Sequence, residues 1–139
     1  MTVEYEVTIY RLDDADYYEG DVTVSVLGRD ITAYYQTPME FAPERLTPGA
    51  IVLVDLWHVY GKAVKIGNDQ KAFLNHPGSQ RATIRGRVVD VMSPTELRVD
   101  CGFLVDVENL DELRGISVGD FIETTAGFQV YFPGTDWER

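Results

Sequence analysis

Apolar and polar residues alternate along most of the chain, and the periodicity typical of helices is scarce. In segment 3–9 the odd positions are apolar and the even positions are mostly polar, which is typical of a strand with one buried face. The turn-forming segment 13–21 interrupts this pattern, and alternation then resumes at Val22, Val24 and Val26. The pattern therefore predicts an all-β protein.

The rest of the first half predicts three more strands. A strand is expected over 31–36 and another over 51–60, whose nearly continuous apolar run indicates burial on both faces. Between them, segment 37–49 contains three prolines, so it allows no more than one turn of helix. A short strand near 63–66 closes this half, and segment 68–80 is interpreted as a linker because it is rich in turn-forming residues.

The second half begins with a predicted strand over 83–92. A type I turn follows it and places Ser93 opposite Glu96, and in that register Val88 lies opposite Cys101. The remaining elements are expected in this order: a strand over 103–107, a short helix over 109–115 ending at Gly115, and a hairpin of strands 121–125 and 128–132 around Ala126-Gly127.

This order of elements repeats that of the first half. The matching segments are 31–36 with 104–109, 46–54 with 116–124, and 58–60 with 129–131. Repetition of a whole unit predicts two small β modules that arose by internal duplication.

Each module is expected to contain three strands, a short helical turn and two further strands. This order resembles the OB-fold, a five-stranded Greek-key barrel, and SH3-like barrels are the alternative. We therefore expect two tandem five-stranded barrels, over residues 1–67 and 81–139, joined by the linker 68–80.

The net charge of −11 implies that nucleic acid and anionic membranes repel the chain on average. No apolar run approaches the roughly 18 residues of a membrane-spanning helix, and no leader-like segment opens the sequence, so we expect a cytoplasmic protein without membrane contact.

Cys101 is the only cysteine, which excludes an internal disulfide. Its alternation with Leu97 and Val99 favours a buried side chain over a catalytic thiol.

Charge is unevenly distributed, and the window 57–89 carries a local charge of +5 in this acidic chain. Aromatic residues are interleaved with the cations there, which is the pattern that single-stranded nucleic acid requires for stacking and phosphate contacts. The alternative is that neighbouring acids neutralise these cations on a solvated strand face. The candidate binding residues are Trp57, Tyr60, Lys62, Lys65, Lys71, Arg81, Arg85 and Arg87.

A second candidate surface combines an acidic loop with tyrosines. Exposed tyrosines favour protein interfaces, and an acidic loop favours a basic partner. The loop could also hold calcium, but its spacing does not match an EF-hand, so a solvated hairpin tip is the preferred interpretation and no metal site is predicted. The candidate interface residues are Tyr17, Tyr18, Tyr34, Asp14, Asp16 and Glu19.

Catalytic motifs are missing from the sequence. It has no nucleophile elbow and no phosphate-binding glycine loop, and its two histidines, His58 and His76, do not have zinc-ligand spacing. The first hypothesis is therefore a non-catalytic module without cofactor that binds a protein partner. The second is an OB-like binder of single-stranded nucleic acid or another polyanion, and the third is an enzyme with carboxylate chemistry. The sequence leaves the oligomeric state open.

Overall fold

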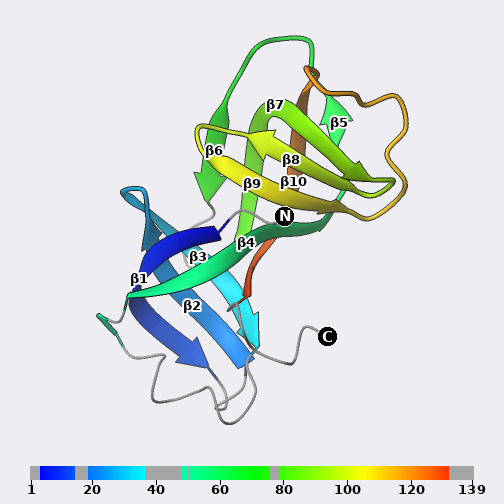
Figure 1. The fold of residues 1–139 in the computed structure, drawn as a ribbon. Helices are drawn as coiled ribbons and strands as arrows, with labels where there is room; N and C mark the ends of the chain where they lie inside the picture. Colours follow the sequence, from blue (N-terminus) through cyan, green and yellow to red (C-terminus); the bar gives the residue numbers. More distant parts are fainter. Residues whose placement is uncertain (1–3, 15–18, 37–47, 50, 76–78, 132–139) are drawn as a thin grey trace.

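The computed structural model describes residues 4–14, 19–36, 48–49, 51–75 and 79–131, and within them it contains strands and no helix (Figure 1). The all-β prediction is confirmed. The strands are β1 (Glu4–Asp14), β2 (Glu19–Val26), β3 (Arg29–Gln36), β4 (Ile51–Gly61), β5 (Val64–Lys65), β6 (Ala72–Asn75), β7 (Arg81–Ser93), β8 (Glu96–Asp100), β9 (Leu104–Asn109) and β10 (Phe121–Tyr131).

The strands form one sheet in the order β5-β10-β3-β2-β1-β4-β9-β8-β7-β6, in which β10 also pairs with β4 and β7. The pairings β1–β2, β2–β3, β3–β10, β10–β4 and β4–β1 return to their starting strand, so the sheet includes a closed barrel. Figure 1 shows β1, β2 and β3 in one lobe and β5 to β9 in the other, with β4 passing between the lobes.

Strands from the two halves of the chain pair with each other. β4 runs parallel to β9, and β10 runs parallel to β3 and antiparallel to β4. The segment predicted as a linker contains β6, which pairs with β7. Two barrels in tandem are thus not confirmed, and the division near residues 67 and 81 stays a prediction.

The core is a single cluster with members from both halves. It forms because alternate residues of each strand point inward, as the sequence pattern predicted. Aromatic rings connect the halves, since Phe103 packs edge-on against Tyr5 of β1 at 6.2 Å between ring centroids and against Phe73 at 5.5 Å. The guanidinium of Arg29 lies 5.0 Å from the centroid of the Phe103 ring.

The predicted hairpin around Ala126-Gly127 is wrong, because β10 is one continuous strand. Its residues 121–127 pair with β7, and its residues 128–131 pair with β4. Phe128 donates its N–H to the carbonyl of Gln80 at 2.9 Å, which keeps the chain extended where a turn was expected. The change of partner, not a turn, occurs at Gly127.

The predicted helix over 109–115 is also wrong, because this segment makes its hydrogen bonds to other parts of the chain. Leu110 donates its N–H to the carbonyl of Gly61 at 2.8 Å, and Leu113 donates to that of Pro94 at 2.7 Å. The Asn109 side chain accepts from the N–H of Ala63 and donates to the carbonyl of Asp111. These contacts hold the segment in a non-helical path that contains bends.

The register of the β7–β8 hairpin was predicted in part. Ser93 lies opposite Glu96 as expected, but Val88 lies opposite Val99 and not opposite Cys101. Two irregularities in β7 cause the shift, and each inserts a residue that has no opposite partner. Val88, Val99 and Cys101 are nevertheless all buried on the predicted face.

Candidate functional site

A row of side chains crosses the outer face of the sheet where the two halves meet. In register, Tyr34 of β3 lies opposite Gln129 of β10, which lies opposite Trp57 of β4. Trp57 in turn pairs with Asp106 of β9, and Asp106 lies opposite Arg98 of β8. Residues paired across strands share a face of the sheet, so these five side chains form one line, which we call the junction row.

An ion pair fixes one end of the junction row. Arg98 donates from Nε to Asp106 Oδ1 at 2.8 Å and from Nη2 to Oδ2 at 3.4 Å. The Asp106 side chain is only 1% exposed, so the guanidinium compensates a carboxylate that has lost its water. The hydrogen bond to Asp106 raises the pKa of Arg98 above its ordinary value. This end of the row is therefore rigid.

Exposed apolar side chains lie on the same strand as Trp57. Ile51 is 64% exposed, Leu53 is 53% exposed, and Tyr10 on the neighbouring strand β1 is 67% exposed. Leu53 lies opposite Glu6 and Ile51 opposite Thr8, so these residues belong to the outer face of β1 and β4. We call Tyr10, Ile51 and Leu53 the β1–β4 apolar patch.

Sequence reasoning missed this patch because it assigned burial on both faces to the whole segment 51–60. Residues 54–59 are indeed mostly buried, but the first three residues of β4 are not. Because the run is almost entirely apolar, the sequence does not distinguish its exposed first residues from its buried ones. Tyr10 was likewise not singled out.

Most cations of the basic window lie beside acids. The ion pairs are Lys62–Asp111 at 3.7 Å, Lys65–Asp120 at 3.6 Å, Lys71–Asp100 at 2.7 Å and Arg85–Glu123 at 2.5 Å between nitrogen and oxygen. Among the residues that the structure describes, exposed Arg81 and Arg87 have no such contact. Trp57 lies in the junction row beside Asp106, and Tyr60 is exposed at the end of β4 with a positive φ of 67°.

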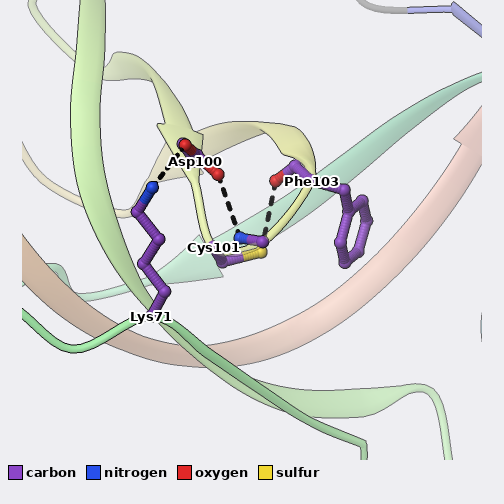
Figure 2. Close-up of polar contacts among 5 residues, drawn as sticks. Lys71, Asp100, Cys101 and Phe103 are labelled. Atoms are coloured by element: carbon purple, nitrogen blue, oxygen red, sulfur yellow. Dashed lines mark hydrogen bonds and ion pairs between the residues drawn. The ribbon is translucent and has the colours of Figure 1, made fainter.

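Figure 2 shows how one of these cations is held. The ammonium of Lys71 contacts one carboxylate oxygen of Asp100, and the N–H of Gly102 donates to the other at 3.0 Å. Both contacts lower the pKa of Asp100, and the hydrogen bond from Lys71 has the larger effect. Cys101 beside it is buried against the carbonyl of Phe103, and burial raises the pKa of its thiol to about 11. A thiol held neutral in this way is suited to packing rather than to nucleophilic attack.

The acidic loop gives a more limited picture. Asp16, Tyr17 and Tyr18 lie outside the described residues, as does His76. Asp14 ends β1 and Glu19 begins β2, so the two strands bring these positions to one end of the sheet. Of this predicted set, Tyr34 lies in the junction row.

Within the described ranges, no helix is long and apolar enough to cross a membrane. The same part of the chain contains no group of three histidine, cysteine or acidic side chains placed to hold a metal ion. No family model, no curated protein and no solved structure matches the chain.

Proposed function

We propose that the chain is a non-catalytic interaction module that binds a protein partner through the junction row and the β1–β4 apolar patch. The observation that carries this proposal is that Trp57 of the junction row lies on β4, the strand whose first residues include exposed Ile51 and Leu53. Aromatic residues and arginine are enriched at the energetically important centres of interfaces. Contiguous exposed apolar surface marks such interfaces on soluble domains.

The charge of the chain indicates the chemistry of the partner. At a net charge of −11, long-range attraction favours a basic protein surface and disfavours an acidic one. Acidic positions at the β1–β2 end of the sheet, Asp14 and Glu19 among them, would contribute to this attraction. We therefore expect association to slow as salt concentration rises.

The test compares two exposed apolar positions. Leu53→Lys introduces a charge into the patch, whereas Val118→Lys changes a similarly exposed residue in the other half. Proteins that the native chain enriches from a cell extract should be lost with Leu53→Lys and retained with Val118→Lys. The partner is then purified and titrated against both variants. Equal binding by the two variants would contradict the proposal.

The polyanion hypothesis is our second proposal, and the ion pairs count against it. Four of the six cations in the window already contact a carboxylate, and binding a phosphate would first break those contacts. A Trp137→Phe variant leaves Trp57 as the sole tryptophan. Salt-sensitive quenching of its fluorescence by an oligonucleotide would favour this hypothesis over protein binding.

We also propose that the two halves are duplicated OB-like units that exchange one strand. In support, Gly49 donates to the carbonyl of Ile9 at 2.7 Å, and Gly119 donates in the same way to Val88 at 2.8 Å. Both glycines have positive φ, and an irregularity follows Ile9 in β1 as it follows Val88 in β7. The pairings β7–β8, β8–β9, β9–β4 and β10–β7 mirror those of the first half.

A further inference from the structure

Among the described residues, no strand lies on the second side of β5. This strand is the end of the strand order and pairs only with β10 among the described strands. Ile66, the next residue, donates its N–H to the carbonyl of Phe121 at 2.9 Å. Successive residues of a strand direct their N–H and C=O groups to opposite sides, so the backbone groups of Lys65 point away from β10.

The side to which Lys65 points is the side on which β9 pairs with β4. There, the carbonyl of Gly61 accepts from Leu110, and the N–H of Ala63 donates to the side chain of Asn109 at 2.8 Å. β9 ends at Asn109, and none of residues 111–120, all of which the structure describes, makes a backbone hydrogen bond to segment 61–66. An added strand could therefore pair with the backbone at Lys65, on the side of β4 and β5 that β9 occupies only as far as Asn109.

A groove of about 590 Å³ lies beside the residues that precede Lys65, namely Lys62, Ala63 and Val64. Its apolar lining includes Val64, which is exposed, and Leu113 and Ile116, which pack against the core. Lys62 and Asp111 also line it and form an exposed ion pair at 3.7 Å. The volume lies within the range of about 300–1,000 Å³ that ligand sites commonly have.

We propose that this groove binds an extended peptide segment of another protein, which adds a strand to the free edge of β5. The backbone of Lys65 would supply one N–H and one C=O to the added strand. Alternate side chains of the peptide would stand on Leu113 and Ile116, which gives specificity in recognition of this kind. Exposed edges are usually protected by charge or covered by chain, and here the groove leaves room for a strand.

A partner protein is favoured over a second copy of this chain because of charge. Two copies at −11 each repel one another, whereas the groove itself carries both signs. The peptide is therefore expected to have apolar residues at alternate positions and little net charge. This groove does not include Trp57, Leu53 or Tyr10, so the inference is independent of the function proposed above.

The experiment uses the full chain and random heptapeptides displayed on phage. Selected peptides are synthesised, and their binding is mapped by NMR. We expect shifts of the Lys65 amide and of the Leu113 and Ile116 methyl groups. N-methylation of the peptide at alternate residues should weaken binding at least about tenfold in one register and less than about twofold in the other.

Two variants at Lys65 separate backbone from side-chain recognition. Lys65→Pro removes the N–H that points away from β10, while the bond from Ile66 to β10 remains, so peptide affinity should fall at least about tenfold. Lys65→Ala keeps that N–H and should bind within about threefold of the native chain. If Lys65→Pro does not fold, the N-methylated peptides decide the question on the native chain.

Several outcomes would overturn the inference. It fails if selection yields no binder, if binders shift residues outside the groove, or if N-methylation has the same effect in both registers. Light scattering that shows a dimer formed through β5 would assign the edge to a second copy instead. Leu53→Lys serves as a control, because it should abolish binding at the β1–β4 apolar patch and leave peptide affinity unchanged.

Discussion

His58 is expected to make the protein sensitive to mild acid. Its side chain is fully buried on β4, where Nε2 lies 2.9 Å from the carbonyl of Ala82 and the ring packs edge-on against Phe128. Burial lowers the pKa of His58 from 6.5 to about 4, although the hydrogen bond to the carbonyl of Ala82 opposes the shift. The ring is therefore neutral near pH 7, and Nε2 donates to Ala82.

The sign of the effect follows from proton binding. Below pH 6.5 the unfolded chain takes up a proton on His58, whereas the folded chain does so only near pH 4, so acid favours unfolding. The stability contribution is fully present above pH 6.5 and is lost as the pH falls toward 4. The shift corresponds to about 3 kcal/mol of unfolding free energy.

Urea unfolding followed by tryptophan fluorescence, at several pH values between 7 and 4, measures this loss. His58→Phe replaces the ring with one that cannot bind a proton, and it gives up the bond to Ala82 at every pH. Between the two ends of the range, the native protein should lose about 3 kcal/mol more stability than His58→Phe does. His76→Asn removes the other histidine and is measured in the same way, to separate its share of the pH dependence from that of His58.

Parallel stability curves for the native protein and His58→Phe would refute this reasoning. They would mean that the imidazole is solvated or already charged in the folded state. Carboxylates also titrate in this range, but they are common to both proteins and cancel in the comparison.

Three further predictions concern the folded structure. Arg98→Met should destabilise the protein by about 3–5 kcal/mol in urea unfolding, because Asp106 would be a buried carboxylate without its cation, and Arg98→Met combined with Asp106→Leu should recover most of the loss. Tyr60→Gly should raise stability by up to about 1 kcal/mol, since φ at this exposed residue is 67°, and a lower urea midpoint would contradict this. Residues 1–67 expressed alone should give the circular dichroism of an unfolded chain, because β3 and β4 lack β10, and cooperative unfolding of this fragment would show that the first half is independent.

Local patterns predict the strands well because successive side chains of a strand point to opposite faces, so every second residue is buried and apolar. Val22, Val24 and Ile31 were placed in strands from alternation, and all are buried. The sequence could not predict which strands pair across the two halves, since β4–β9 and β10–β3 join segments that are far apart in the chain. For this reason the local pattern predicts a turn at Ala126-Gly127, where β10 in fact continues.

The candidate site was predicted only as separate residues. Trp57 and Tyr34 were assigned to different surfaces, and nothing in either local pattern indicates that Gln129 would lie between them. Asp106 and Arg98 were not chosen as site residues because each occupies an ordinary polar position of a strand. Their proximity follows from register, which depends on the irregularities in the hairpins as well as on the alternation.

The position of β10 has a consequence for synthesis on the ribosome. Its residues 128–131 complete the barrel that begins with β1, so the first barrel wall cannot close until residue 131 has been translated. Through most of that time β3 and the middle of β4 present unpaired backbone to the surrounding medium. Until β10 emerges from the exit tunnel, a nascent chain of this kind stays monomeric only if self-association is slow or if a chaperone protects the unpaired strands.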